Sequence, residues 1–356
     1  MKIEISENIS LAEFTTLHLG GAAKYFCRCT SVGELQEALE FARQKDLRTH
    51  ILAGGSNTVF SDSGFDGLVV KIDARGISFI DDGNDILVIV RAGEDWEKFV
   101  AMCVGKGYAG IECLSGIPGS VGATPIQNVG AYGQEVKDTI ATVKVIDRST
   151  LNEVTFSNSD CQFSYRQSRF KSQDSGKYII TEVTFRLKKN GGPTINYPEV
   201  KKMVEASVPL SSLADGKESL TAVRNVVLSL RKKKSMVIDP NDPNTKSVGS
   251  FFMNPVVDGT QLLVISNRWK QIGDGTALPT FASGGKTKIP AAWLIEKSGF
   301  KKGYTKNGVG ISDNHTLALV NRGGTTAALL ALAKEIRDGV EKKFGIRLEQ
   351  EPVVVE

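Results

Sequence analysis

Residues 110–133 read GIECLSGIPGSVGATPIQNVGAYG, with six glycines, two prolines and a single charged side chain, Glu112. Glycine permits positive φ angles and close backbone approach, whereas proline fixes φ and lacks an N–H donor. This composition is not that of a helix or strand interior. We therefore expect a shaped main-chain surface, on which a ligand with phosphates and a flat ring can lie.

The rest of the composition is that of an ordinary globular protein. The chain has 356 residues, 41% hydrophobic and 24% charged, which predicts two or three domains. The net charge of +4 is spread along the chain, so nucleic acid is a poor candidate partner. The one dense basic cluster, residues 231–234, is expected to be a solvated helix end, with one member reaching an anionic ligand at most.

Cysteine usage and hydropathy indicate the compartment. The five cysteines are odd in number and have no C-x-x-C spacing, which favours reduced thiols and predicts no metal site. Residues 1–5 lack a signal-peptide pattern, and no 18-residue apolar window indicates a membrane span. We expect a cytoplasmic protein without membrane or nucleic-acid partners.

Hydrophobic periodicity divides the chain into three parts of an α+β protein. The first lobe, residues 1–73, contains a helix from Val32 and a strand at 68–72, and residues 346–356 are expected to pack near it. The second lobe, residues 74–220, contains strands at 87–93, 143–147, 153–156 and 178–187. The third part, residues 221–345, contains helices at 222–234, 291–296 and 325–344.

Two glycine-rich turns are candidates for phosphate binding. Neither a G-x-G-x-x-G sequence between a strand and a helix nor a Walker A motif is present. Instead, Gly54-Gly55-Ser56-Asn57 and Gly116-x-x-Gly119-x-x-Gly122 can each form a nest of main-chain N–H groups that holds an anion. Two ordinary tight turns are the alternative interpretation, which the longer segment disfavours.

Motifs in order along the whole chain closely resemble the UDP-N-acetylenolpyruvoylglucosamine reductase family. They are HLGG at 18–21, AGGSN at 53–57, GIPGSVGA at 116–123, QNVGAYG at 127–133, CQFSYRQS at 161–168, GSFFMNP at 249–255, AAWLIE at 291–296 and LEQEP at 348–352. The resemblance implies a two-lobed FAD-binding fold of the vanillyl-alcohol-oxidase type, followed by a substrate-binding domain. The tyrosine in INYP, residues 195–198, is typical of the subtype that keeps a tyrosine-bearing substrate loop.

The resemblance also implies the cofactors and the reaction. In this family NADPH reduces a non-covalently bound FAD, which then reduces UDP-N-acetylglucosamine enolpyruvate to UDP-N-acetylmuramate for peptidoglycan synthesis. The residues that match the family's FAD-binding motifs are Gly54, Gly55, Ser56, Asn57, Ser115, Gly116, Ile117, Pro118, Gly119, Ser120, Gly122, Ala123, Gln127, Asn128, Gly130, Ala131 and Tyr132.

Three residues match the family's catalytic positions. Ser250 stands at the position of the proton donor, Arg166 at that of the arginine that stabilises enolate charge, and Glu351 at that of the carboxylate that assists enol formation. Taken alone, each of the three would be read as an ordinary turn or surface residue.

Substrate-binding residues are carried over more loosely, as Tyr197, Lys234, Asn254, Lys302 and His315. The run Phe300-Lys301-Lys302-Gly303 leaves the register of the lysine open by one residue. His315 is read equally well as a satisfied loop histidine.

The chain departs from the family pattern at three places. Met253 stands where some members have lysine, only five residues follow Glu351, and residues 266–286 form an insertion expected to be a surface loop. We expect a monomer. Two alternatives stay open: a sugar or alcohol oxidase with covalent flavin at His18 or Cys113, and a non-catalytic flavin or nucleotide-sugar binding module.

Overall fold

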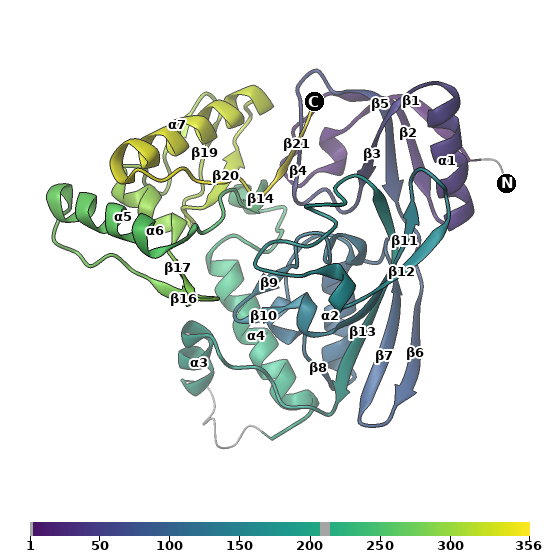
Figure 1. Ribbon diagram of the computed structural model, residues 1–356, viewed down its shortest axis with the longest axis horizontal. Coiled ribbons are helices and arrows are strands. Elements are labelled where there is room, and N and C mark those ends of the chain that lie inside the picture. The colour runs from purple at the N-terminus through teal and green to yellow at the C-terminus, as the bar shows by residue number, and fades with distance from the viewer. Residues whose placement is uncertain (1–2, 207–213) are drawn as a thin grey trace. The chain divides into compact units, whose positions relative to one another are not determined.

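The computed structural model describes residues 3–206 and 214–356 (Figure 1). Residues 1–2, with which the predicted first lobe begins, and 207–213, inside the predicted second lobe, lie outside the described residues. The chain forms two compact units, each made of three segments. Unit 1 comprises Met1–Ile9, Ala23–Gly55 and Asp66–Val237, and unit 2 comprises Ser10–Ala22, Ser56–Phe65 and Ile238–Glu356.

The first sheet of unit 1 has four strands and one helix. Its order is β1-β2-β5-β3, with β1 (Ile5–Ser10), β2 (Ala22–Cys29), β5 (Phe65–Ile72) and β3 (Arg48–Leu52), of which β3 and β5 are parallel. Helix α1 (Val32–Gln44) begins where the Ser31 side chain accepts a hydrogen bond from the Glu34 N–H. It buries Leu35, Ala38, Leu39 and Ala42, which are the residues that the periodicity predicts.

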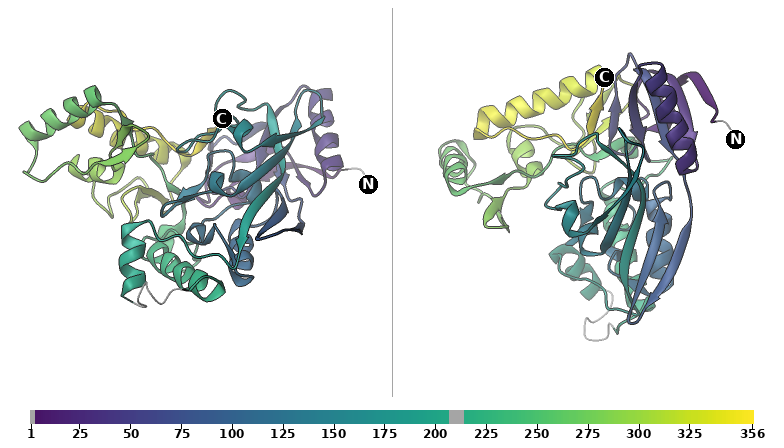
Figure 2. Two further views of the ribbon diagram at one scale, coloured as in Figure 1. Left: turned by 60° about the horizontal axis from the view of Figure 1, so that its bottom comes forward. Right: turned by 45° about the vertical axis from the view of Figure 1, so that its right-hand side comes forward.

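The second sheet of unit 1 is antiparallel and carries helices on one face. Its order is β12-β11-β13-β7-β6, with β8 beside β13. The strands are β6 (Ile77–Asp82), β7 (Asp85–Arg91), β8 (Tyr108–Ala109), β11 (Ile140–Asp147), β12 (Glu153–Ser157) and β13 (Tyr178–Lys189). Helices α2 (Trp96–Gly105) and α4 (Lys217–Lys233) lie on the same side of this sheet (Figures 1 and 2), and α3 (Pro198–Glu205) packs on α4.

The core under α2 is aromatic. The rings of Trp96 and Phe99 lie 5.9 Å and 5.1 Å from the ring of Phe185 on β13, between centroids. All three side chains are fully buried, and their contact anchors the start of α2 against the sheet. After α2 the chain forms β8 and then enters the glycine-rich segment, residues 110–133.

The glycine-rich segment is irregular, as the sequence predicts. It contains only the 3-10 turns η2 (Glu112–Leu114) and η3 (Val121–Ala123) and the short pair β9 (Gly130–Ala131) and β10 (Gln134–Glu135). Positive φ angles recur along it, at Gly110, Gly116, Asn128, Tyr132 and Gly133 among others. The remaining described 3-10 turns are η1 (Ala12–Phe14), η4 (Val136–Asp138), η5 (Ser159–Cys161) and η7 (Pro243–Thr245).

Unit 2 combines three small sheets with three helices. The sheets are β14-β20-β19-β18, β15-β17-β16 and the parallel pair β4-β21. The strands are β4 (Thr58–Phe60), β14 (Ser247–Ser250), β15 (Val256–Val257), β16 (Phe281–Ser283), β17 (Lys286–Lys288), β18 (Thr305–Lys306), β19 (Val309–Ile311), β20 (Ala318–Asn321) and β21 (Val353–Val355). The helices are α5 (Gly259–Ile272), α6 (Ala291–Lys297) and α7 (Thr326–Phe344), and α7 packs against α5, α6, β19 and β20.

The prediction of a surface loop over residues 266–286 is wrong for most of its length. Helix α5 continues to Ile272, and residues 281–288 form the β16-β17 hairpin. A capping box between Asp258 and Gln261 starts the helix, and Ile265 and Trp269, four residues apart, bury its inner face. Only residues 273–280 are irregular.

The structure also gives the state of the cysteines, the grouping of possible metal ligands and the length of the apolar helices. All five cysteines are buried and unpaired. Over residues 3–206 and 214–356, no three His, Cys, Asp or Glu side chains are grouped so that they could hold a metal ion. Among the helices described, none is long and apolar enough to cross a membrane.

Candidate active site

The two predicted glycine turns meet backbone to backbone in unit 1. A Cβ atom added to Gly54 would lie 2.4 Å from the Cα of Gly119, so nothing larger than glycine fits there without displacing one chain. Gly55 and Gly119 have φ angles of +67° and +124°, which favour glycine. Two segments more than sixty residues apart in sequence therefore form one main-chain surface.

Donors without protein partners lie on this surface. The Ser120 hydroxyl is buried and has no hydrogen-bond partner. The N–H groups of the buried residues Gly55 and Ser120 also make no hydrogen bond within the described part of the chain. Because a buried donor is seldom left unsatisfied, this arrangement suits a diphosphate held by main-chain N–H groups and one hydroxyl. The residues fit the pyrophosphate of FAD.

Several of the predicted cofactor residues use their N–H groups inside the chain, among them Asn128, which donates to the Pro125 carbonyl at 3.4 Å. Ser115 donates to the Glu112 carbonyl and Gly116 to the Glu97 carboxylate, which also pairs with Arg224. Gly122 donates to the Ala92 carbonyl and Ala123 to that of Ser120. The N–H groups of these residues therefore stabilise the shape of the segment and are not available to bind a ligand. Ile117 and Pro118 precede Gly119 and are half-buried.

Asn128 links the glycine-rich residues 110–133, called the cofactor segment below, to the chain around Arg166. Its fully buried side chain donates to Glu135 Oε2 (2.8 Å) and to the Ser164 carbonyl (2.9 Å), and it accepts from the Lys137 N–H (3.1 Å). Arg166 Nη2 in turn donates to the Gly130 carbonyl at 2.9 Å. The predicted catalytic arginine therefore lies against predicted cofactor residues of the same unit.

Neighbouring residues complete this part of unit 1. Gln127 is half-buried, and its Oε1 lies 3.5 Å from Lys171 Nζ, whose ammonium also contacts the Arg166 carbonyl. Ala131 pairs with Gln134 in the short β9-β10 hairpin. The hairpin presents Tyr132 toward the tyrosine-bearing loop.

Tyr132, Tyr197 and Lys234 come together in unit 1. The two rings meet edge to face with centroids 5.4 Å apart, and Lys234 Nζ lies 5.8 Å from the Tyr132 ring centre. Lys234 also pairs with Glu199 at 2.8 Å. Burial lowers the pKa of Lys234, but the hydrogen bond to Glu199, together with the electrostatic effects of Tyr132, Glu199 and Tyr197, leaves that pKa above its ordinary value. Tyr197 itself is 42% exposed and accessible to a ligand.

The basic cluster at the end of α4 differs from the prediction at one position. Lys232 and Lys233 are solvated, as expected, but Arg231 is buried, donates from Nη2 to the Met236 carbonyl (2.8 Å) and leaves Nε without a partner. Burial lowers the pKa of its guanidinium. The helix periodicity places Arg231 on the inner face, beside Gly116.

Ser250 and Glu351 lie on adjacent chain segments of unit 2. The Glu351 N–H donates to the carbonyl of Phe251, the residue after Ser250, at 2.9 Å. Phe252 forms a bridge with Gln350, and Met253 donates to Glu349. Asn57, a predicted cofactor residue that follows the half-buried Ser56, donates from Nδ2 to the Glu351 carbonyl (3.3 Å). Arg166, the third predicted catalytic residue, belongs to unit 1.

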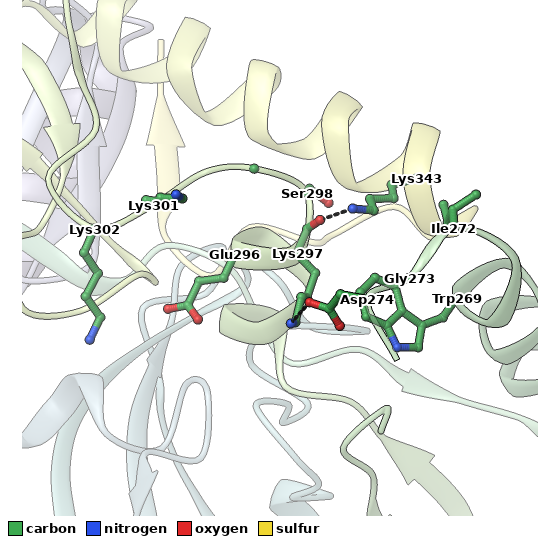
Figure 3. Close-up of a pocket in the computed structure, with 11 residues that line it drawn as sticks. Trp269, Ile272, Gly273, Asp274, Glu296, Lys297, Ser298, Lys301, Lys302 and Lys343 are labelled. Carbon is green, nitrogen blue, oxygen red and sulfur yellow. Dashed lines mark hydrogen bonds and ion pairs between the residues drawn. The ribbon is translucent and has the colours of Figure 1, made fainter. Parts of the chain in front are cut away.

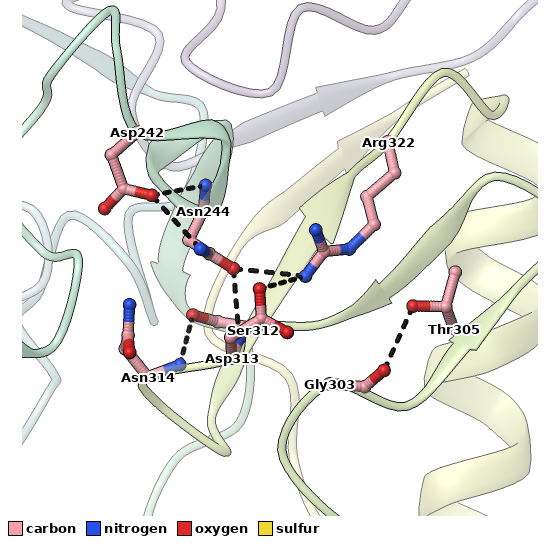
Figure 4. Close-up of polar contacts among 8 residues, drawn as sticks. All are labelled: Asp242, Asn244, Gly303, Thr305, Ser312, Asp313, Asn314 and Arg322. Atoms are coloured by element: carbon pink, nitrogen blue, oxygen red, sulfur yellow. Dashed lines mark hydrogen bonds and ion pairs between the residues drawn. The ribbon is translucent and has the colours of Figure 1, made fainter.

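A polar cluster in unit 2 holds the loop of His315 (Figure 4). Asn244 accepts from the Asp313 N–H (3.0 Å) and from Arg322 (3.1 Å), and its own N–H and amide contact Asp242. Arg322 also pairs with Asp313 at 2.9 Å. The cluster fixes residues 312–315 to the segment that leads into β14 and Ser250, and Figure 4 shows Asn244 at its centre.

The other two predicted substrate residues of unit 2 lie in different surroundings. Asn254 is half-buried and accepts from the Ala291 N–H at the start of α6 (2.9 Å), which leaves its amide N–H groups for a ligand. Lys302 lines a cavity of about 570 Å³ with Lys301, Lys297 and Lys343 (Figure 3). Lys297 is already paired there with Asp274. Neither Ser250 nor Glu351 lines this cavity.

Sequence reasoning missed three polar residues that organise these groups: Glu112, Glu97 and Asn244. Glu112 had a visible signal, because it is the single charged side chain in the glycine-rich segment. The partners of Glu97 and Asn244 lie far away in sequence and have no local signature.

Comparison with known proteins gives the family. Residues 23–150 match a family described as FAD binding domain, and residues 240–355 match the UDP-N-acetylenolpyruvoylglucosamine reductase, C-terminal domain. The chain is 44% identical to the UDP-N-acetylenolpyruvoylglucosamine reductase of Thermobifida fusca, covering 100% of this chain and 99% of that one. It is also 44% identical to that of Salinispora arenicola, covering 97% and 94%.

A solved structure shares the fold. The crystal structure of UDP-N-acetylenolpyruvylglucosamine reductase from Thermus caldophilus matches with a TM-score of 0.65 over 100% of both chains, at 22% sequence identity. The predicted α+β flavoprotein fold is confirmed. This chain belongs to the UDP-N-acetylenolpyruvoylglucosamine reductase family and is an oxidoreductase with an FAD-binding domain.

Proposed function

We propose that the protein reduces UDP-N-acetylglucosamine enolpyruvate to UDP-N-acetylmuramate with NADPH and FAD, as a step of peptidoglycan precursor synthesis. The observation that carries the proposal is the main-chain hydrogen bond between Glu351 and Phe251, which holds a carboxylate and the Ser250 hydroxyl on adjacent segments. We further propose that the protein acts as a cytoplasmic monomer.

The cofactor is held without a covalent bond. Gly54, Gly55, Gly119 and Ser120 bind the pyrophosphate of FAD through main-chain N–H groups and the Ser120 hydroxyl. When bound, FAD supplies hydride transfer in two steps, first from NADPH and then to the substrate. Tyr132 and the Gly130–Ala131 main chain belong to the same glycine-rich segment, where the Gly130 carbonyl accepts a hydrogen bond from Arg166.

Arg166 and Glu351 act on the charge of the enolpyruvyl group. Hydride addition to the vinyl carbon places negative charge on the enolate of the substrate carboxylate, and the planar Arg166 fork stabilises that charge with two parallel donors. Glu351 assists the enol form. The Gly130 carbonyl holds the Arg166 guanidinium, so that its orientation is set before substrate arrives.

Ser250 delivers the proton that completes the reduction. A serine hydroxyl is a very weak acid, so a nearby cation or a proton relay must stabilise the alkoxide that is left behind. Met253 supplies no such cation where some family members have lysine. Lys234 with Tyr197, and Asn254, Lys302 and His315, bind the diphosphate and sugar of the substrate.

The oxidase alternative is disfavoured by the environment of Cys113. Its side chain is fully buried and its thiol donates to the Thr194 carbonyl at 3.2 Å. Burial raises the pKa of this thiol, which keeps it protonated and unreactive toward a flavin. Acid precipitation tests the point, because a yellow pellet would reveal covalent flavin and contradict the proposal.

The function is tested by turnover and by half-reactions. The purified protein should be yellow and should oxidise NADPH rapidly only when UDP-N-acetylglucosamine enolpyruvate is present. Bound flavin without turnover on that substrate would contradict the assignment.

Ser250→Ala should separate the two half-reactions. Loss of a general acid costs roughly 10²–10⁴-fold, so reoxidation by substrate should slow by that factor while flavin reduction by NADPH stays nearly unchanged. Ser266→Ala is the matched control, since Ser266 lies on helix α5 of unit 2, away from the proposed site residues, and its loss should leave both steps unchanged. Equal slowing of both steps in Ser250→Ala would remove Ser250 from this role.

A further inference from the structure

Glu112 is a fully buried carboxylate inside the glycine-rich cofactor segment. Its Oε2 accepts from the Gly110 N–H at 2.8 Å, and its Oε1 accepts from Gln134 Nε2 at 2.8 Å and from the Thr194 N–H at 2.7 Å. A buried charge is strongly unfavourable unless hydrogen bonds surround it, and these three donors supply them. The carboxylate therefore holds three separate pieces of chain at one point.

A second connection runs parallel to the first. Gln134 Oε1 accepts from the Cys113 N–H at 2.7 Å, and the Cys113 thiol donates to the Thr194 carbonyl at 3.2 Å. Burial raises the pKa of Cys113, so the thiol keeps the proton that this bond requires. Thr194 is thus held through its N–H by Glu112 and through its carbonyl by Cys113.

Thr194 leads directly into the tyrosine-bearing loop. Tyr197 follows three residues later, and its ring packs edge to face on Tyr132 of the cofactor segment. Gly133 lies against the same loop, since a Cβ atom there would come within 3.6 Å of Asn196 Cβ and 3.9 Å of the Tyr197 nitrogen. The cofactor segment and the loop are joined at the Glu112 end and touch again at the Tyr132 end.

We propose that Glu112 is a positioning residue that couples the cofactor segment to the placement of Tyr197 for substrate binding. It touches neither ligand and acts through Thr194 and Gly110. The proposal rests on the proposed function, in which residues 110–133 hold FAD and Tyr197 contacts the substrate.

Glu112→Gln tests the coupling while keeping the shape of the side chain. Its amide NH2 must face one of the N–H donors, so at least one of the three bonds is lost. A hydrogen bond to a charged group stabilises the folded position of the loop more than a neutral one does. Its loss should displace Tyr197, and we expect KM for the enolpyruvyl substrate to rise roughly tenfold. The rate of flavin reduction by saturating NADPH should stay within about twofold of wild type, because that step does not need Tyr197.

Asp147→Asn is the matched control. Asp147 is also a buried carboxylate of unit 1, and its Oδ1 accepts three hydrogen bonds, from the Ser149 N–H and hydroxyl and from the Thr150 N–H, in the β11-β12 turn. Both variants should lose stability, but only Glu112→Gln should change KM. An equal KM increase in both variants would contradict the proposal.

A double-mutant cycle separates positioning from general destabilisation. Tyr197→Phe should raise KM in the wild-type background and have a much smaller effect in the Glu112→Gln background, because the loop is already displaced. Additive effects would overturn the proposal. Cys113→Ala, which removes one tether of Thr194 without leaving a buried charge, should raise KM in the same direction if Glu112→Gln does not fold.

Hydrogen exchange in the FAD-bound protein tests the Glu112 coupling independently of the proposed reductase activity. Amides 194–197 should exchange faster in Glu112→Gln than in wild type and unchanged in Asp147→Asn. Absence of wild-type turnover would refute the proposed function alone, whereas unchanged exchange in Glu112→Gln would refute the coupling.

Discussion

Arg166 and Tyr132 have φ angles of +55° and +49°, in a region that non-glycine residues rarely adopt. Such a conformation costs on the order of 1 kcal/mol per residue and persists only where neighbours enforce it. Here the Arg166–Gly130 hydrogen bond and the Tyr132–Tyr197 ring contact are the enforcing interactions. Both residues belong to the proposed site, where fixed side-chain direction is worth more than local stability.

His50 gives a stability prediction at the same scale. Burial on β3, and secondarily the charge of Arg148, lower the pKa of His50 to about 4 from its ordinary value near 6.5. The stabilisation is complete above pH 6.5, where both folded and unfolded chains are neutral at this residue. As pH falls from 6.5 to about 4, only the unfolded chain takes up the proton, and roughly 3 kcal/mol of stability is lost.

His50→Gln removes that titration. Urea unfolding at pH 7 and pH 4 should show wild type losing up to roughly 3 kcal/mol more than the variant over this interval. Parallel stability curves for the two proteins would show that burial of His50 does not depress its pKa.

Glycine turns were predictable where their neighbours in sequence carry the information, whereas the roles of single site residues stay predictions. Gly54 and Gly119 could be recognised because the motifs around them are local. The role of Glu112 could not, because its partner Thr194 lies 82 positions away and a buried charge looks like any other glutamate in sequence. Arg231 was misjudged for the same reason, since the partners that bury it are not adjacent in the chain.

At the scale of elements, helices with clear caps and periodicity were predictable. The predicted helix at 325–344 matches α7 within one residue, because the Thr325 cap and the apolar spacing are both local. The insertion was not, because α5 depends on Ile265 and Trp269 finding a core that the insertion itself does not contain. The predicted division into residues 1–73, 74–220 and 221–345 stays a prediction, because the two compact units of the structure are a different kind of division.

The meeting of the two glycine segments is the element contact that we expect to matter most for FAD. Gly54→Ala places a methyl group 2.4 Å from Gly119 Cα, so the two main chains must separate. Overpacking of this kind costs about 1–3 kcal/mol, and FAD should bind roughly tenfold or more weakly. The dissociation constant can be measured by quenching of flavin fluorescence.

Gly105→Ala is the control for this substitution. Gly105 is an exposed residue at the end of α2 in the same unit, and a Cβ atom there meets nothing within 4 Å. This variant should bind FAD like wild type and gain up to ~0.5–1 kcal/mol of stability. Equal FAD affinity in both variants would mean that the close approach of Gly54 and Gly119 does not form the FAD-binding surface.

At the scale of the whole molecule, unit 2 is assembled from segments far apart in the chain. Strand β21 near the C-terminus pairs in parallel with β4 at residues 58–60. Asp62 accepts from the Thr326 and Ala327 N–H groups at 2.7 Å and 2.8 Å, at the start of α7, and Asn321 donates to the Leu17 carbonyl at 2.9 Å. Such pairing has no local signal, so the division of the chain into segments of the two units could not be predicted from sequence.

This arrangement predicts that residues 238–356 do not fold alone, although the family's C-terminal domain matches 240–355. The isolated fragment lacks the partner of β21 and the carboxylate that caps α7, so it should show reduced helical circular dichroism and no cooperative thermal transition. In the full chain, Asp62→Ala should cost about 0.5–2 kcal/mol through the lost cap. A fragment that unfolds cooperatively, with the helix content of the intact unit, would show that β4 and Asp62 are dispensable. Adding a peptide of residues 56–65 provides the positive control, because β4 and Asp62 restored in trans should increase the helical signal of the fragment.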